Sequence, residues 1–323
     1  MTKLTRRAVI AGLTSFTVIP ERSVAAPPAG PITIVHGFAP GGPTDTLARI
    51  VAERLSNKLE RQVIVDPRAG ASGTIAAAQV ARAAADGSTL IILPGAPATT
   101  AALYKKLPYR PVDDFSMISL IGEHPFAVVT NAEHSIHSIA DLLDTARSRK
   151  TPVLYGTAGT GSTMHLSGEL LARTANVHFQ HVPYRGSAPA VTDLLAGRID
   201  FMVDPPALML EFIAVDKLRA LAVTSASRSF TLPDVPTISE AAFPGYVVTS
   251  WFGLAGPAGL PASFVDRVNQ ALVEILAEPT VVERLQNLGE TPRSCSPVEF
   301  RARIAADIEK WTGVIDFASI ERI

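Results

Sequence analysis

Apolar segments alternate with segments of helical periodicity along the first part of the chain. Short apolar runs predict strands, and apolar residues spaced three and four apart predict amphipathic helices. The strands are predicted at residues 32–35, 62–65 and 89–93, and the helices at residues 47–59 and 73–85. Strands that alternate with helices favour a parallel sheet joined by right-handed crossovers.

The alternation starts again near residue 125 and continues to residue 223. Strands are predicted at residues 125–130, 152–155, 178–182, 199–203 and 218–223, and helices at residues 139–146, 162–171 and 190–196. Residues 264–312 are mostly helical in pattern. No single linker divides the chain, because its 25 prolines lie in short connections that read as rigid loops. We therefore expect two α/β lobes joined by two crossings, with residues 26–125 and 251–323 in one lobe and residues 126–250 in the other.

The first 25 residues have the pattern of a secretory signal peptide. Lys3, Arg6 and Arg7 precede an apolar run at residues 8–19, which is too short for a permanent membrane span. Ser23-Val24-Ala25 has the small residues of a cleavage site, so we expect cleavage after Ala25. An uncleaved membrane anchor is the alternative, and the adjacent arginines leave both the general secretory and the twin-arginine routes open.

Composition and charge exclude several classes of protein. The 323 residues carry a net charge of −1, and the first 25 carry +3, so the remainder would carry −4. A nucleic-acid-binding protein would show a basic excess, and none is present. The one cysteine, Cys295, excludes an internal disulfide and any thiolate-rich metal site. No other apolar run reaches the length of about 18 residues that a membrane-spanning helix needs.

Two glycine-rich turns lie between a predicted strand and a predicted helix. They read GFAPGGPTD at residues 37–45 and GTAGTGS at residues 156–162. Glycines allow close approach to the backbone, and a helix N-terminus directs free N–H groups at an anion. Facing each other across a cleft, the two turns would bind the two ends of a small anion. A purely structural strand-to-helix turn is the alternative for each of them.

The sequence offers little for catalysis. The turn RAGASG at residues 68–73 resembles the other two, and its Arg68 is a possible counter-charge but fits a surface position better. The seven histidines lack the spacing of a metal site, and the glycine-rich turns match neither a phosphate-binding P-loop nor a dinucleotide fingerprint. Ser162 lacks the Gly-x-Ser-x-Gly spacing of a hydrolase nucleophile. A secreted hydrolase that uses Ser162 or Ser72 remains the alternative from the enzyme class.

Taken together, these segments resemble the receptors of tripartite tricarboxylate transporters, the TctC or Bug-type extracytoplasmic binding proteins. The resemblance runs from about residue 31 to residue 311. The segments that carry it are GFAPGGPTDTLAR (37–49), VDPRAGASG (65–73), ADGSTL (85–90), YGTAGTGSTMHLSGELL (155–171), HVPYRGSAPAVTDLLAGRID (181–200), LRALAVTSASRS (218–229), LPDVPTISEA (232–241) and WFGLAGPAGLP (251–261). Pro67 and Ser88 depart from the usual family residues.

The resemblance implies a type II periplasmic-binding-protein fold, with a small carboxylate held in the cleft largely by backbone N–H groups. The loops that correspond to the family's binding loops are residues 37–45, 70–73 and 156–162. The residues expected to contact the ligand are Phe38, Ala39, Pro40, Gly41, Gly42, Thr44, Asp45, Ala71, Ser72, Gly156, Thr157, Ala158, Gly159, Thr160, Gly161, Ser162, His165, Tyr184 and Asp204.

The function that this resemblance implies is capture of a solute rather than catalysis. We expect a periplasmic, monomeric receptor without metal or cofactor, which delivers a small organic carboxylate to the permease subunits of a tripartite tricarboxylate transporter. A ligand-sensing subunit for a signalling kinase is the alternative within binding proteins. The sequence does not identify the carboxylate, because specificity depends on the volume of the cleft and on a few side chains within it.

Overall fold

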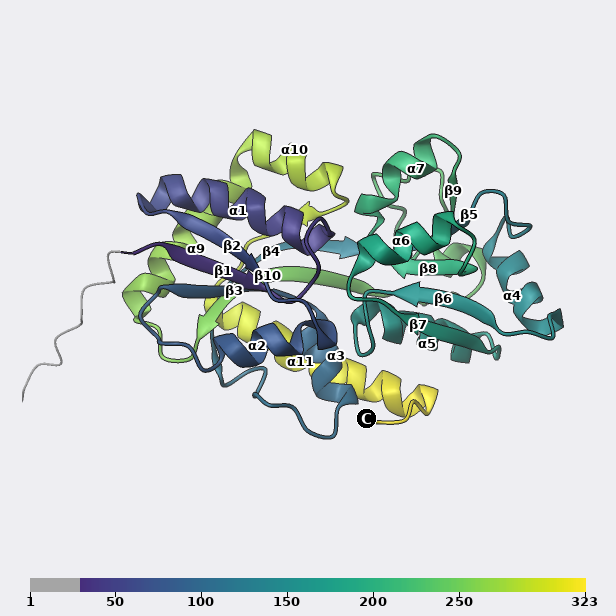
Figure 1. Ribbon diagram of the computed structural model, residues 1–323, viewed down its shortest axis with the longest axis horizontal. Helices are drawn as coiled ribbons and strands as arrows, with labels where there is room; N and C mark the ends of the chain where they lie inside the picture. The colour runs from purple at the N-terminus through teal and green to yellow at the C-terminus, as the bar shows by residue number, and fades with distance from the viewer. Residues whose placement is uncertain (1–29) are drawn as a thin grey trace, which may run out of the picture.

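The computed structural model describes residues 30–323, in which two α/β lobes lie side by side (Figure 1). The predicted signal peptide lies outside these residues. Each lobe is built around its own sheet, and the chain crosses from the first to the second after Pro125 and returns before Thr249. Two lobes and two crossings are therefore as predicted.

The sheet of the first lobe has six strands in the order β11-β4-β10-β3-β1-β2. The strands are β1 (Ile32–His36), β2 (Val63–Pro67), β3 (Thr89–Pro94), β4 (Phe115–Pro125), β10 (Thr249–Pro257) and β11 (Thr291–Pro292). Strands β1, β2 and β3 are parallel, but β10 is antiparallel to β3 and β4. The parallel arrangement predicted for the first three strands is confirmed, whereas β10, which the sequence did not predict as a strand, re-enters from the second lobe and runs antiparallel to β3.

The sheet of the second lobe has five strands in the order β7-β6-β8-β5-β9. The strands are β5 (Ala127–Asn131), β6 (Val153–Thr157), β7 (Phe179–Pro183), β8 (Phe201–Asp204) and β9 (Leu218–Val223). Strands β6, β7 and β8 are parallel, whereas β5 is antiparallel to both β8 and β9. The prediction of parallel strands is confirmed for β6, β7 and β8 and does not hold for β5, which enters from the other lobe.

Helices cover both faces of each sheet. Those in the chain segments before and after the second lobe are α1 (Pro43–Leu59), the short 3₁₀ helix η1 (Ala71–Gly73), α2 (Thr74–Val80), α3 (Ala96–Leu103), α9 (Ala262–Ala277), α10 (Pro279–Asn287) and α11 (Pro297–Ala318). Those in the second lobe are α4 (Ile139–Ser148), α5 (Thr163–Thr174), α6 (Ser187–Leu195), the 3₁₀ helix η2 (Pro206–Leu208), α7 (Leu210–Ala214) and α8 (Ile238–Ala241). The helix predicted to reach residue 85 ends at Val80, because the N–H groups of Arg82 and Ala83 bond to carbonyls three residues back.

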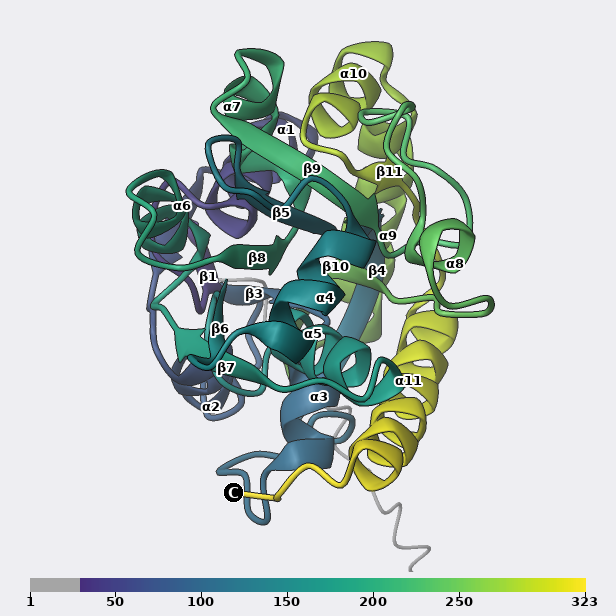
Figure 2. The same ribbon diagram turned by 90° about the vertical axis from the view of Figure 1, so that its right-hand side faces the viewer.

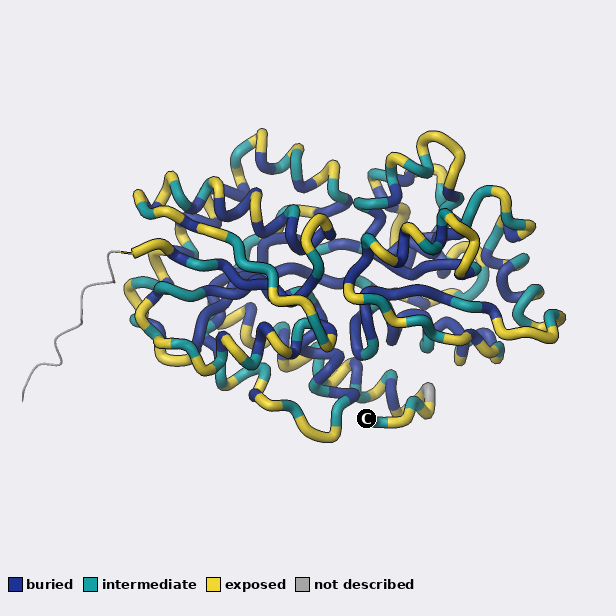
Figure 3. Tube along the Cα trace, in the orientation of Figure 1, coloured by how far each residue is buried: buried dark blue, intermediate teal, exposed yellow. Residues whose placement is uncertain are grey.

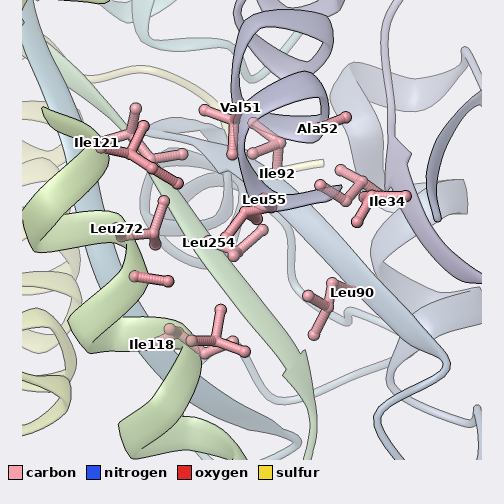
Figure 4. Packing of buried hydrophobic residues seen from close by; sticks show 14 of the residues in the cluster. Ile34, Val51, Ala52, Leu55, Leu90, Ile92, Ile118, Ile121, Leu254 and Leu272 are labelled. Carbon is pink, nitrogen blue, oxygen red and sulfur yellow. The ribbon is translucent and has the colours of Figure 1, made fainter. Parts of the chain in front are cut away.

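The main core of the first lobe lies between its sheet and helices α1 and α9 (Figure 4). Leu55 of α1 and Leu272 of α9 are fully buried against Ile34 and Leu254 of the sheet. Full burial of such a side chain stabilises the fold by about 1.5–3 kcal/mol. The apolar spacing seen in the sequence therefore places α1, and with it the loop before it, firmly on the sheet.

Helices α3 and α11 connect the two lobes. Phe300 and Ile304 of α11 are buried in a cluster of the first lobe, whereas Trp311 and Ile315 are buried with the second. Figures 1 and 2 show α11 running along both lobes, beside α3. Figure 3 shows that buried residues form the centre of each lobe and continue through the connection between them. Within residues 30–323, none of the helices is long and apolar enough to span a membrane.

Candidate functional site

A cavity lies between the lobes, where the crossing strands meet the N-termini of helices α1, α5 and α6. The first lobe and the crossings contribute Phe38, Ala39, Gly42, Pro43, Thr44, Pro94, Ala96, His124, Phe126, Ser250 and Phe252 to its lining. The second lobe contributes Ala158, Ser162, Thr163, Met164, Gly186, Ser187 and Pro205. We refer to this space as the central cavity. Its lining is mostly apolar, with hydroxyl groups, the His124 ring and the helix starts as the polar elements.

The N-terminus of α1 opens into the central cavity without a side-chain cap. Gly42 occupies the N-cap position, and none of its neighbours supplies a capping hydrogen bond. Pro43 has no N–H, so the amide of Thr44 is the first backbone donor of the helix. The first N–H groups of a helix have no acceptor inside it and favour an anion. This end of α1 is therefore suited to bind a carboxylate.

Asp45 fixes this loop instead of facing the cavity. One of its oxygens, Oδ1, lies 3.0 Å from Nε2 of His36, and Oδ2 accepts hydrogen bonds from the amide of Gly41 and from Arg49. Burial acts to raise the pKa of Asp45, but these hydrogen bonds and the charge of Arg49 outweigh it and hold the pKa below its usual value. Burial lowers the pKa of His36. Asp45 therefore acts as a positioning residue for the loop.

The loop before α5 is held in the same way by two histidines of the second lobe. Nδ1 of His165 accepts a hydrogen bond from the amide of Gly161, and Nε2 of His181 lies 2.6 Å from Oγ1 of Thr157. The two imidazole rings are 4.1 Å apart. Burial lowers the pKa of His165 to about 4, and burial together with the charge of His165 lowers the pKa of His181 to about 3. Both rings are therefore neutral near pH 7 and act as a support for the loop.

Ser162 caps α5 and is not arranged as a nucleophile. Its hydroxyl donates a hydrogen bond to the carbonyl of Gly159 and accepts one from the amide of His165. Ser72 likewise donates its hydroxyl proton to the carbonyl of Thr160. Within residues 30–323, no imidazole hydrogen-bonds to either serine, so the hydrolase alternative lacks its base.

A second hollow lies next to the central cavity and has a volume of about 230 Å³. It is lined by Gly37, Phe38, Gly70, Ala71, Ser72, Tyr104, Ala158, Gly159, Thr160, Pro183, Tyr184 and Arg185. Phe38 and Ala158 line both spaces, so the two are adjacent. The lobes touch here, since the Ser72 hydroxyl of the first lobe reaches the Thr160 carbonyl of the second.

The turn before α2 has an unusual backbone where it meets the second lobe. Ala71 and Ser72 both adopt the left-handed region, with φ values of 46° and 51°. Non-glycine residues persist there only where the surrounding structure holds them, and such strain is frequent at functional sites. The turn also lies against the first glycine loop, because a Cβ on Gly37 would stand 2.2 Å from Cα of Gly73.

Replacing Gly159 with alanine is expected to weaken ligand binding about 10-fold or more. Gly159 has a φ of 137°, and a Cβ there would lie 2.8 Å from Oγ of Ser72 in the opposite lobe. The added methyl group opposes the closed arrangement, and apparent affinity falls in proportion to the closed population. Titration calorimetry measures the effect. Gly197→Ala is the control, because Gly197 also has a positive φ, of 66°, but has no atom within 4 Å of the added Cβ. Equal affinity in both variants would contradict the prediction.

Asp204 lies immediately behind the central cavity. It is 1% exposed, and its Oδ1 accepts a hydrogen bond of 2.6 Å from the Ser187 hydroxyl. Its Oδ2 is buried without a hydrogen-bond partner among residues 30–323. Burial raises the pKa of Asp204 to about 7, although the bond from Ser187 acts in the opposite direction. The carboxyl group therefore titrates near neutral pH.

The predicted site residues fall into three groups in the structure. Those at the central cavity are Phe38, Ala39, Gly42, Thr44, Ala158 and Ser162. Those at the second hollow, besides Phe38 and Ala158, are Ala71, Ser72, Gly159, Thr160 and Tyr184. Those that line neither space are Pro40, Gly41, Asp45, Gly156, Thr157, Gly161, His165 and Asp204. Direct ligand contact by any of these residues stays a prediction.

The crossing strands supply lining residues that the sequence did not reveal. His124 lies on β4 and Phe126 directly follows it, and Ser250 and Phe252 lie on β10, where Ser250 pairs with His124. The one available signal was the polar pair Glu123-His124 between two apolar runs. The strand that pairs with this segment, β10, lies more than 120 residues away in the chain. The sequence could therefore not show that His124 faces the cavity.

Comparison with known proteins assigns the chain to a group of binding proteins. A family model described as a tripartite tricarboxylate transporter family receptor matches residues 47–319. The structure of the periplasmic binding protein BugD is 33% identical, with a TM-score of 0.87, and the match covers 91% of this chain and 99% of that one.

Two similar structures contain ligands. R. palustris Rpa4515 with adipate is 36% identical, with a TM-score of 0.88 and coverage of 92% and 99%. MatC (Rpa3494) from Rhodopseudomonas palustris with bound malate is 32% identical, with a TM-score of 0.85 and coverage of 89% and 99%. The expected fold is thereby confirmed, and these neighbours are binding proteins rather than enzymes.

Proposed function

Because the chain belongs to the tripartite tricarboxylate transporter receptor family, we propose that it captures a small organic carboxylate between its lobes and delivers it to the permease of such a transporter. The observation that carries this proposal is the pair of helix N-termini, of α1 and α5, at one central cavity. Adipate and malate in two relatives support the same class of ligand.

Backbone donors explain how a carboxylate can bind where no lysine or arginine is present. Gly42, Thr44, Ser162 and Thr163 bring the two helix starts to the cavity, and no lysine or arginine of residues 30–323 lines it. Each helix start carries a partial positive charge of about half an elementary charge. Because this charge acts locally, the overall negative charge of the protein does not oppose binding.

Binding requires the lobes to move relative to each other. The central cavity is about 30 Å³ in this closed arrangement, and a water molecule needs roughly 10–15 Å³ of such space. A carboxylate with several carbon atoms therefore enters a more open form. A ligand that touches both lobes then shifts the population towards a form closed around it.

The site of capture is proposed to be the periplasm. The pattern of residues 1–25 supports export, with cleavage after Ala25, and similar proteins include a periplasmic binding protein. A form closed around the ligand would distinguish a loaded receptor from an empty one for the permease.

Thermal unfolding with a panel of mono- and dicarboxylates tests the carboxylate proposal. A ligand present at about 100 times its dissociation constant should add roughly 2.7 kcal/mol to the free energy of unfolding and raise the Tm. A neutral sugar and a cationic amine serve as controls and should leave the Tm unchanged. The proposal would be ruled out if the Tm rose with the sugar or the amine and with none of the carboxylates.

A further inference from the structure

A buried histidine–glutamate pair lies at the wall of the central cavity formed by the crossing strands. Nδ1 of His124 is 3.0 Å from Oε2 of Glu290, and the two side chains are 2% and 1% exposed. His124 is near the end of β4, and Glu290 directly precedes β11, whose Thr291 pairs with Glu123 of β4. The short strand β11 therefore brings together two residues that are 166 positions apart.

The orientation of the His124 ring is fixed from several sides. The ring lies 4.9 Å from the ring of Phe252 and 5.5 Å, edge to face, from the ring of Phe126. Glu290 occupies Nδ1, and Nε2 has no hydrogen-bond partner among residues 30–323. His124 itself lines the cavity. This arrangement leaves Nε2 as the polar atom of the ring that a ligand can reach.

His124 differs in character from everything else in the cavity wall. Of the lining residues found in the described part of the chain, it is the one with an ionisable side chain. The others are apolar residues, glycines, prolines and hydroxyl residues, together with the helix starts. Helix starts can hold one carboxylate of a ligand, but a second buried carboxylate needs its own charged or strong donor.

We propose that His124, positioned by Glu290, binds the second carboxylate of a dicarboxylate ligand. Nδ1 of the ring stays bonded to Glu290, and Nε2–H is donated to the ligand, so that the ring lies between two carboxylates. A carboxylate behind a histidine orients the ring, as in many metal sites. This inference rests on the proposed function and makes it specific: the pair selects dicarboxylates over monocarboxylates of equal length.

Calorimetry with matched pairs of ligands tests the inference on the full mature protein. The pairs are succinate with butanoate, glutarate with pentanoate, and adipate with hexanoate, which differ by one carboxylate at constant chain length. For the best-bound pair, the unmodified protein is expected to bind the dicarboxylate at least about 10-fold tighter. The comparison therefore measures the second carboxylate alone.

Two variants separate the role of the pair from general packing. His124→Phe keeps an aromatic ring between Phe126 and Phe252, and it is expected to bind the dicarboxylate roughly 10- to 100-fold more weakly, with the monocarboxylate changed by less than about threefold. Glu290→Gln keeps an acceptor for Nδ1 but removes the charge, and it should reduce the preference in the same direction. His137→Asn, at an exposed histidine, is the control and should leave both affinities unchanged.

The outcomes separate failure of the inference from failure of the proposed function. Equal affinity of the unmodified protein for both members of each pair overturns the inference and leaves carboxylate capture intact. Equal weakening of both members in His124→Phe also overturns it, because the ring would then serve packing alone. If circular dichroism shows that His124→Phe is unfolded, Glu290→Gln decides, and an unchanged preference in it overturns the inference. Binding of no carboxylate by the unmodified protein overturns the proposed function and the inference together.

Discussion

Replacing Asp45 with alanine is expected to lower the free energy of unfolding by about 2–3 kcal/mol, the usual effect of leaving a buried polar group without its partner. The Asp45 side chain is 6% exposed and His36, its partner at 3.0 Å, is fully buried. Alanine would leave the fully buried His36 ring without its acceptor, whereas the Gly41 amide, at an exposed residue, could bond to water instead. An unsatisfied buried polar group is destabilising because it loses its hydrogen bonds to water without a replacement.

The same variant should also weaken carboxylate binding, because Asp45 holds the loop that leads into α1. Urea denaturation at pH 7 measures the stability, and calorimetry with the best carboxylate measures the affinity. Arg49→Ala is the matched control: Arg49 also bonds to Asp45, but its side chain is 59% exposed. Exposed ion pairs contribute at most about 1 kcal/mol. A loss in Asp45→Ala no larger than that in Arg49→Ala would show that the buried contacts do not hold the loop.

Asp45 also illustrates what the sequence could and could not predict about the site. The glycine-rich turns, the helices that follow them and their meeting at one cavity were predictable, because glycine, proline and helix periodicity act locally. The direction of the Asp45 side chain was not, because it depends on His36 at the end of β1. Asp45 therefore braces the loop before α1, and the ligand contact that the resemblance implies for it stays a prediction.

The crossing strands mark the other limit of sequence-based prediction. Strands β4 and β10 lie together in the first sheet, although more than 120 residues separate them in the chain. Their register decides that His124, Ser250 and Phe252 line one cavity, and no local pattern encodes that register. The pairing of His124 with Glu290 depends in turn on β11. Backbone chemistry was therefore predictable, whereas the side chains that distinguish ligands were not.

Asp204 is expected to make the protein less stable as the pH rises from about 4 to about 7. Its pKa in the folded protein is raised to about 7 from an ordinary value of 3.8, so the folded protein holds this proton more tightly than the unfolded chain. The stability that this tighter proton binding gives is fully present below pH 3.8 and is lost as the pH rises through 7. At 1.36 kcal/mol per pKa unit the total is about 4 kcal/mol, of which roughly 2–3 kcal/mol falls between pH 5 and pH 8.

The buried histidines act in the opposite direction over part of this range. The pKa values of His165 and His181 are lowered to about 4 and about 3 from an ordinary value of 6.5. Above pH 6.5 both histidines are neutral in the folded and the unfolded chain and do not change the free energy of unfolding. As the pH falls below 6.5, the unfolded chain binds protons that the folded protein does not, so stability is lost. Between pH 4 and pH 6.5 the two effects oppose each other. The stability of the unmodified protein alone therefore does not isolate Asp204, and a comparison with a variant is needed.

Asp204→Asn supplies this comparison, because asparagine has a similar shape and does not ionise. Urea denaturation at several values between pH 5 and pH 8 should show the variant gaining stability relative to the unmodified protein by roughly 2–3 kcal/mol as the pH rises. Asp144→Asn is the control, since Asp144 is 75% exposed, and its profile should parallel that of the unmodified protein. Parallel profiles for Asp204→Asn as well would mean that the Asp204 carboxyl group ionises as freely in the folded protein as in water. In that case Oδ2 of Asp204, which is buried without a partner in the closed arrangement, would contact solvent or a counter-charge in solution.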